Sequence, residues 1–139
     1  YGQFIPSSYR AYAIDFDNDG YVDLLNSVDD AIGSIANYLY IHGWNEDLPT
    51  VRRIDKKFLS NTESINNVRH PLVLVPNILH VGDELENEDI LDQSVLLLSY
   101  SERGKTNFFI GTANFIAITK YNRSHFYAKA VYDLSIELR

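Results

Sequence analysis

The segment of residues 15–26 constrains the fold more than any other part of the sequence. Aspartates stand at its first, third, fifth and ninth positions, namely Asp15, Asp17, Asp19 and Asp23. Gly20 stands at the sixth position and permits a sharp turn. This is the spacing of an EF-hand loop, in which alternate side chains converge on one point. Val22 is the apolar position that holds such a loop against a core, so we expect the loop to pack on its neighbours.

The oxygen atoms of this loop suit a hard divalent cation. Ca²⁺ takes six to eight oxygens at about 2.3–2.6 Å. The expected ligands are the side chains of Asp15, Asp17, Asp19, Asp23 and Asn26 and the backbone carbonyl of Tyr21. Asn26 departs from the pattern, because a bidentate Glu is usual at the twelfth position and an amide offers one neutral oxygen. The pattern therefore predicts structural calcium rather than a calcium sensor. The alternative is an Asx-rich surface turn that binds no ion, in which the aspartates would repel one another.

A helix is predicted directly after this loop. Ser27 is a good N-cap, and Asp29 and Asp30 follow in the first turn, where carboxylates favour the positive end of a helix. Gly43 is a C-terminal stop. The predicted buried face is the apolar stripe of Val28, Ile32, Ile35 and Leu39.

The C-terminal part returns to helix. A short helix from Phe115 to about Lys120 is expected to precede a second one, which Ser124 caps. The second helix carries an apolar face composed of Tyr127, Ala130, Val131, Leu134 and Leu138.

The middle of the chain indicates strands and loops. Residues 72–75 form a short apolar run, and residues 94–100 and 106–111 flank a Gly-containing hairpin loop at 101–105. The acidic stretch 83–92 is typical of a solvated loop or short helix. The predicted fold is α+β: helical parts at 1–44 and 113–139 pack together, and a small antiparallel β insertion at 45–112 lies between them.

The composition of the chain limits the kinds of partner that it can bind. The chain has 139 residues, which is the size of one domain, and a net charge of -7, so it is a poor candidate for binding nucleic acid. Its clear basic cluster, Arg52, Arg53, Lys56 and Lys57, is too short for a DNA footprint. The absence of cysteine excludes disulfides and thiolate chemistry. No apolar run is long enough to span a bilayer.

Several blocks together resemble a known family. The first block is Tyr1-Gly2-Gln3-Phe4-Ile5-Pro6-Ser7-Ser8-Tyr9, and it continues through residues 12–16 and the acidic loop. Further blocks are residues 30–39, 42–44, 114–115, 118–122, 124 and 127–131. In this order they resemble the family of membrane-bound lytic transglycosylase B, although residues 45–92 carry little of the pattern.

The resemblance implies an activity. It implies a lysozyme-like core and a periplasmic enzyme that cleaves the β-1,4 bond between N-acetylmuramic acid and N-acetylglucosamine of peptidoglycan glycan strands. The product is a 1,6-anhydro sugar, and a single Glu acts as general acid and base, in contrast with two-carboxylate glycosidases. The family places this Glu upstream of the Tyr-Gly-Gln-Phe block. We therefore expect no catalytic residue in this sequence, and we expect the sequence to be inactive alone. Any association with the outer membrane is expected to depend on an upstream anchor.

The resemblance also implies substrate contacts. Gln3 matches the glutamine that hydrogen-bonds a sugar, and Tyr121 and Asn122 match a Tyr-Asn pair near the catalytic acid. Phe4, and also Tyr127, are candidates for the cleft wall, with core packing as the alternative for both.

Two other readings of the residues stay open. One is a non-catalytic module that binds cell-wall glycan, because it would keep Gln3 and Tyr121 without an acid. The other is a calcium-stabilised interaction module of the dockerin kind, which is disfavoured because dockerins carry two such loops and this sequence carries one.

Overall fold

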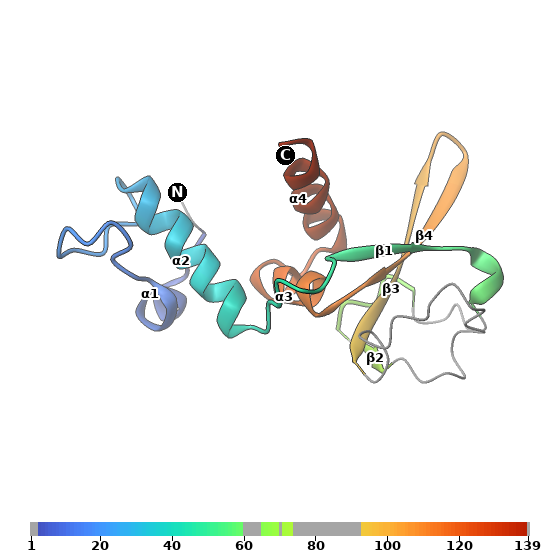
Figure 1. Cartoon of the computed structure of the whole chain (residues 1–139), viewed down its shortest axis with the longest axis horizontal. Coiled ribbons are helices and arrows are strands. Elements are labelled where there is room, and N and C mark those ends of the chain that lie inside the picture. Colours follow the sequence, from blue (N-terminus) through green and yellow to red (C-terminus); the bar gives the residue numbers. More distant parts are fainter. Residues whose placement is uncertain (1–2, 60–64, 70, 74–92, 139) are drawn as a thin grey trace. The chain divides into compact units, whose positions relative to one another are not determined.

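A computed structural model describes residues 3–59, 65–69, 71–73 and 93–138 of the chain. Contacts within the chain divide it into two compact units, Tyr1–Trp44 and Asn45–Arg139 (Figure 1). The described part of the first unit is helical, and that of the second combines a sheet with helices. The fold is therefore α+β, as predicted. The finer division into parts at 1–44, 45–112 and 113–139 stays a prediction.

The described residues of the first unit form two helices. Helix α1 spans Pro6–Tyr12, and the sequence analysis did not identify it, although proline at the first helical position is a known start signal. Helix α2 spans Val28–Ile41, and the Ser27 side chain accepts a hydrogen bond from the Asp30 N–H, as predicted for an N-cap. The predicted stop is also confirmed, because Gly43 has φ +98° and the Trp44 N–H bonds back to the Leu39 carbonyl.

The predicted buried face of α2 is wrong for two of its four residues. Val28 and Ile32 are 49% and 60% exposed, whereas Ile35 and Leu39 are half-buried. The face that is buried carries Asp30, Ala31, Gly33, Ser34 and Tyr38. Apolar periodicity did not predict the buried face correctly because an extended segment covers α2. The backbone groups of this segment are not bonded within a helix or a sheet. Such a segment needs hydrogen-bond partners, so small and polar residues lie beneath it.

The second unit is built on a four-stranded sheet of order β1-β4-β3-β2, in which every pair is antiparallel. The strands are β1 (Val51–Ile54), β2 (Leu72–Val73), β3 (Ser94–Glu102) and β4 (Lys105–Gly111). A short 3₁₀ helix, η1 (Lys56–Phe58), follows β1. Residues 74–75 and 83–92, for which a strand end and an acidic loop were predicted, lie outside the described residues.

The long hairpin of β3 and β4 confirms the predicted strand pair but not the length of its loop (Figure 1). Glu102 pairs with Lys105, so the turn consists of Arg103 and Gly104 instead of five residues. Both turn residues have positive φ, 48° and 79°. Two-residue turns with left-handed backbone match the twist of paired strands.

The core of the second unit lies against this hairpin. Ile54, Val95, Leu97 and Ile110 form one buried cluster. Leu96 and Leu98 alternate with Val95 and Leu97 along β3 and are also buried, which places them on the other face of the sheet. Because α3 packs against β3, the central strand is covered on both faces.

Helices α3 (Ala113–Tyr121) and α4 (His125–Glu137) follow the sheet, as predicted. Thr112 and Ser124 cap them, each accepting a hydrogen bond from a backbone N–H two or three residues on. Ala128 is the fully buried residue of α4, whereas Val131, Leu134 and Leu138 of the predicted apolar face are 38%, 56% and 78% exposed. None of the described helices is long and apolar enough to cross a lipid bilayer.

An aromatic cluster joins α4 to the hairpin. The Tyr100 hydroxyl donates to the His125 carbonyl at 2.9 Å, and the Lys129 ammonium lies over the Tyr100 and Phe109 rings at 5.6 and 5.2 Å. Lys129 also pairs with Asp133 one turn later, at 2.6 Å. Burial in this cluster lowers the pKa of His125 from its ordinary value of 6.5.

We expect the stability of the protein to fall when the pH drops from about 7.5 to about 5.5. Since the pKa of His125 is lower in the folded state, the unfolded chain binds more protons as the pH falls through 6.5. The stabilisation is therefore fully present above this value and lost below it. Thermal melting at several pH values measures the effect. His125→Gln should flatten the curve in this window, and an unchanged pH dependence in that variant would contradict the assignment.

Candidate functional site

Three aspartates of the acidic loop come together in the first unit. One carboxylate oxygen each from Asp15, Asp17 and Asp19 lies within 4.8 Å of the others. Asp15 is half-buried, and the other two are exposed. The structure therefore brings together three of the six predicted ligands.

Local hydrogen bonds explain how the loop closes. The two carboxylate oxygens of Asp15 accept from the backbone N–H groups of Asp19 at 3.1 Å and Gly20 at 2.9 Å. Asp17 accepts from the Asp19 N–H as well, and Asp19 accepts from the Tyr21 N–H at 2.8 Å. Gly20 has φ +95°, which side-chain-bearing residues rarely adopt, and this is the reason that the sixth position requires glycine.

Asp30 of α2 binds the acidic loop through hydrogen bonds to its backbone. Its side chain is 1% exposed. One carboxylate oxygen accepts from the Phe16 N–H at 2.7 Å and more weakly from that of Asp17, and the other accepts from the Asp23 N–H at 2.8 Å. The hydrogen bond from Asp23 is the main cause that lowers the pKa of Asp30, and it outweighs the opposing effect of burial. Asp30 thus ties both ends of the loop to one point on the helix.

Sequence reasoning assigned Asp30 to the helix dipole and missed this role. A signal was available in the spacing, because Asp30 stands three residues after the N-cap Ser27, as in a capping box. In a capping box the third side chain returns to the N-cap N–H. Here it reaches the loop instead, a destination that depends on tertiary packing.

The segment that leads into the acidic loop packs closely against α2. The Ser34 hydroxyl accepts from the Ile14 N–H at 2.9 Å, and the Asn37 amide donates to the Tyr12 carbonyl at 2.9 Å. Gly33 has no side chain, and a Cβ added there would come within 2.5 Å of the Phe16 ring. The face of α2 is therefore small and polar because it seats the segment that leads into the loop.

Asp23 and Asn26, two of the three remaining predicted ligands, form a turn of their own. Asp23 accepts from the backbone N–H groups of Leu25 and Asn26, both at 2.9 Å, and from the Asn26 side-chain amide at 2.9 Å. The bond from the Asn26 side chain is the main cause that lowers the pKa of Asp23. Asp23 is not part of the three-carboxylate cluster, so metal ligation by Tyr21, Asp23 and Asn26 stays a prediction.

The donor set fits a hard cation. It offers carboxylate oxygens only, close enough together for one ion to span them, and oxygen ligands are those that Ca²⁺ and Mg²⁺ prefer. Asp17 also accepts from the Ser27 hydroxyl at 2.9 Å, which links the cluster to the N-cap of α2. The cluster could therefore hold a metal ion beside the start of α2.

The predicted substrate residues of the first unit lie before α1. Gln3 is exposed, and Phe4 is half-buried. The Phe4 ring lies 6.0 Å from that of Tyr38, which stacks on His42 at 3.9 Å. Phe4 thus contacts an aromatic cluster on α2, which favours packing as at least part of its role.

The predicted substrate residues of the second unit lie at the corner between α3 and α4. Tyr121 is the last residue of α3, Asn122 is its C-cap, and both are half-buried. Burial, and to a smaller extent the charge of Tyr121, raise the pKa of Tyr127. Tyr127 is 37% exposed. This corner therefore carries Tyr121, Asn122 and Tyr127, and their contact with substrate stays a prediction.

The absence of a catalytic acid from this sequence stays a prediction. Hydrogen bonds lower the pKa of Asp23 and of Asp30, whereas an acid that holds its proton near neutral pH needs a raised pKa. Glu84, Glu86, Glu88 and Asp89, which the sequence places in a charge run, lie outside the described residues.

Known proteins match this chain over nearly its whole length. The family described as "Transglycosylase SLT domain" matches residues 1–136. The membrane-bound lytic murein transglycosylase B of Escherichia coli (strain K12) is 35% identical over 136 residues, 96% of this chain and 36% of that protein. The chain therefore spans little more than a third of the length of this relative.

Solved structures of lytic transglycosylases are also similar to this chain. The Escherichia coli lytic transglycosylase Slt35, in complex with calcium, is 30% identical with a TM-score of 0.73, over 95% of this chain and 41% of that one. SltB3 from Pseudomonas aeruginosa, in complex with NAG-anhNAM-pentapeptide, is 31% identical with a TM-score of 0.68, over 93% of this chain and 35% of that one. Both values lie well within the range of a shared fold.

Proposed function

The chain belongs to the transglycosylase SLT domain family, and from this premise we propose that it forms the calcium-bearing and glycan-binding part of a peptidoglycan lytic transglycosylase. The proposed reaction cleaves the β-1,4 bond between N-acetylmuramic acid and N-acetylglucosamine and leaves a 1,6-anhydro sugar. The proposed location is the periplasm. Any attachment to the outer membrane is proposed to occur through an anchor outside this sequence.

The match of one family over residues 1–136 carries this proposal. It spans both units, so it covers the acidic loop and the tyrosine corner together. Two relatives add support, since one was solved with calcium and another with a fragment that contains an anhydro-muramic sugar and a pentapeptide.

In the proposed mechanism the acidic loop is structural. Asp15, Asp17 and Asp19 would hold the calcium ion, whose charge offsets the repulsion of three neighbouring carboxylates. Asp30 then fixes the loop on α2 through its bonds to Phe16 and Asp23. The loop and helix would act as one rigid support for residues that contact sugar.

The proposed sugar contacts come from side chains without charge. The Gln3 amide offers donors and an acceptor to sugar hydroxyls, and a tyrosine ring offers an apolar wall with a polar tip. Tyr121 and Tyr127 suit this second task at the α3–α4 corner, with Asn122 beside them. We propose that the general acid is a Glu outside this sequence and that the Tyr121 hydroxyl would orient it.

A glycan-binding module without turnover is the second candidate. It needs only the sugar contacts proposed for Gln3 and the tyrosine corner, all of which lie within the region that the family matches, and no general acid. Such a module would hold glycan through the same tyrosine corner and release it unchanged.

Release of anhydro-sugar products from purified peptidoglycan tests the proposal. The full-length protein should produce them, and Tyr121→Phe should lower the turnover number about 10²-fold or more, because a positioned hydroxyl at an acid is typically worth that much. The melting temperature should change little, since Tyr121 is half-buried.

Tyr132→Phe is the matched control, because it removes a hydroxyl from α4 at a site assigned no contact with sugar. Equal activity of the Tyr121 variant and the unmodified protein would remove Tyr121 from the site. Binding of glycan without any anhydro product would favour the non-catalytic module.

A further inference from the structure

One hydrogen bond links helix α1 to the acidic loop. The Tyr9 hydroxyl donates to the Val22 backbone carbonyl at 2.7 Å, across 13 residues of sequence. Tyr9 belongs to α1, and Val22 is the eighth residue of the loop. The bond therefore joins the helix that directly follows Gln3 and Phe4 to the segment that carries the candidate metal ligands.

The position of the Val22 carbonyl depends on how the loop is closed. The peptide group that contains this carbonyl also contains the Asp23 N–H, which donates to the Asp30 carboxylate at 2.8 Å. Because a peptide group is planar, its two ends move together. On the other side of Val22, the Tyr21 N–H donates to Asp19, one of the three clustered carboxylates, at 2.8 Å. The carbonyl is therefore held both from α2 and from the candidate metal cluster.

Helix α1 depends on its neighbours for its position. It has seven residues, none of them buried, and its N-cap provides no side-chain hydrogen bond. A helix of this length has little stability of its own. Its last residue is attached to α2, because the Tyr12 carbonyl accepts from Asn37 and the Tyr12 ring lies 4.9 Å from that of Tyr38. The bond from Tyr9 attaches α1 to the loop as well, at a point nearer to Gln3 in the sequence.

This link should be firmest when the loop is closed. The three clustered carboxylates repel one another, and a bound cation offsets that repulsion. Opening of the loop would displace the Val22 carbonyl and release the Tyr9 hydroxyl. A closed loop would keep α1, and the residues just before it, in one position.

We propose that Tyr9 is a positioning residue, whose hydroxyl couples the closed state of the acidic loop to α1 and thereby to the placement of Gln3. The inference rests on the proposed function, because it takes Gln3 to be a sugar contact. Calcium and glycan then bind with positive coupling, and each tightens the binding of the other by the same factor. Tyr9 needs no contact with either ligand for this effect.

Amide hydrogen exchange of the full-length protein tests the link without any sugar. Calcium should slow the exchange of the Tyr9 and Ala13 N–H groups, which donate to the Ile5 and Tyr9 carbonyls at the two ends of α1. We expect the slowing to be about fivefold in the unmodified protein and less than about twofold in Tyr9→Phe. Equal slowing in the two proteins would overturn the proposal.

The variant should fold and still bind calcium. Tyr9 is 41% exposed, so removal of its hydroxyl should disturb the packing little, and the three clustered aspartates are unchanged. A rise of the melting temperature of Tyr9→Phe with calcium checks this expectation. Complete loss of calcium binding would make Tyr9 part of the structure of the loop itself and would also overturn the proposal.

Calorimetric titration with NAG-anhNAM-pentapeptide tests the coupling to sugar. In the unmodified protein, calcium should tighten the binding of this fragment about fivefold relative to protein in chelator, which is the lower end of the usual range for coupled sites. In Tyr9→Phe, the two affinities should agree within about twofold. An absence of coupling in the unmodified protein, or an equal coupling factor in the variant, would contradict the positioning role.

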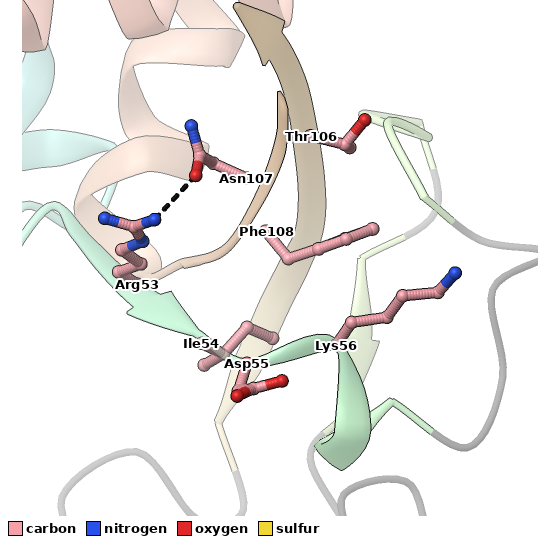
Figure 2. Close-up of a pocket in the computed structure, with 7 residues that line it drawn as sticks. All are labelled: Arg53, Ile54, Asp55, Lys56, Thr106, Asn107 and Phe108. Carbon is pink, nitrogen blue, oxygen red and sulfur yellow. Dashed lines mark hydrogen bonds between the residues drawn. The ribbon is translucent and has the colours of Figure 1, made fainter. Parts of the chain in front are cut away.

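Two control variants separate this link from the general loss of a hydroxyl or a hydrogen bond. Tyr40→Phe removes a hydroxyl from a side chain of α2 that is 75% exposed. Asn107→Ala removes the hydrogen bond of 2.6 Å that Arg53 donates at a pocket of the second unit (Figure 2). Both controls should keep the full effect of calcium on α1 and on the fragment. A loss in either control as large as that in Tyr9→Phe would count against the proposal.

The failure of the proposed function would look different. If the fragment binds neither the unmodified protein nor the variants, the proposed function fails, and the exchange rates in α1 still decide whether Tyr9 links the loop to the helix. If the fragment binds but calcium leaves the exchange of α1 unchanged, the positioning role of Tyr9 is wrong and the proposed function stands.

Discussion

Calcium should raise the melting temperature of this protein by roughly 8 °C when its concentration is about a hundred times its dissociation constant. A ligand that binds only the folded state stabilises it by about 2.7 kcal/mol under this condition. The physical reason is that Asp15, Asp17 and Asp19 lie within 4.8 Å of one another and repel until a cation is bound. Differential scanning fluorimetry with added calcium or with a chelator measures the shift.

Asp19→Ala should abolish this calcium-dependent shift. Asp29→Ala is the matched control, because it removes an equally charged residue from the first turn of α2 that does not belong to the cluster. The control lowers the baseline stability slightly through the helix dipole but should keep the full response to calcium. A shift that persists in Asp19→Ala would contradict the assignment of the loop.

Asn26 bears on the strength of the effect. Its amide donates to Asp23 at 2.9 Å, so it contributes to the turn that closes the loop. A neutral side chain at this position predicts weaker calcium binding than an acidic one would give. The concentration of calcium needed for half of the shift therefore reports how far the loop departs from the standard pattern.

The acidic cluster could be predicted from the sequence because its geometry is local. Three carboxylates at alternate positions and one glycine determine a tight turn within a few residues. The role of Asp30 could not be predicted in the same way. Its partners, Phe16 and Asp23, precede it by 14 and 7 residues and meet it only when the loop has packed on α2.

The fold follows the same division between local and long-range information. Helix caps at Ser27 and Ser124 and the hairpin near Gly104 were predicted, since each depends on a few consecutive residues. The buried face of α2 was predicted wrongly for two of its four residues, because hydrophobic spacing cannot report that the covering layer is an extended backbone. Ser34 is fully buried because it bonds to Ile14, 20 residues earlier.

The buried Asn114 is the clearest case of a polar residue whose importance only the structure reveals. It is 1% exposed at the start of α3. Its side-chain oxygen accepts from the Asn45 N–H at 2.7 Å, and its amide nitrogen donates to the carbonyls of Asn45 at 2.7 Å and Leu48 at 2.8 Å. One side chain therefore satisfies three backbone groups of the segment that leads into β1.

Asn114→Ala should lower the free energy of unfolding by about 3–5 kcal/mol, because each buried backbone group left without a partner costs about 1–3 kcal/mol. This is a large fraction of the total stability of a typical domain. Urea unfolding of the variant should give a lower midpoint with an unchanged slope. Asn107→Ala, on the half-buried edge of β4, is the control and should cost less than about 1 kcal/mol.

Asn114→Asp separates the hydrogen bonds from the volume of the side chain. It keeps an acceptor for the Asn45 N–H but sets a carboxylate oxygen against the two carbonyls, so the folded state disfavours the charged form. The pKa of the new carboxyl is then raised on folding, and the stability lost at neutral pH should return in part as the pH falls toward about 4. A loss that is equal at both pH values, or smaller than that of Asn107→Ala, would show that water replaces the amide.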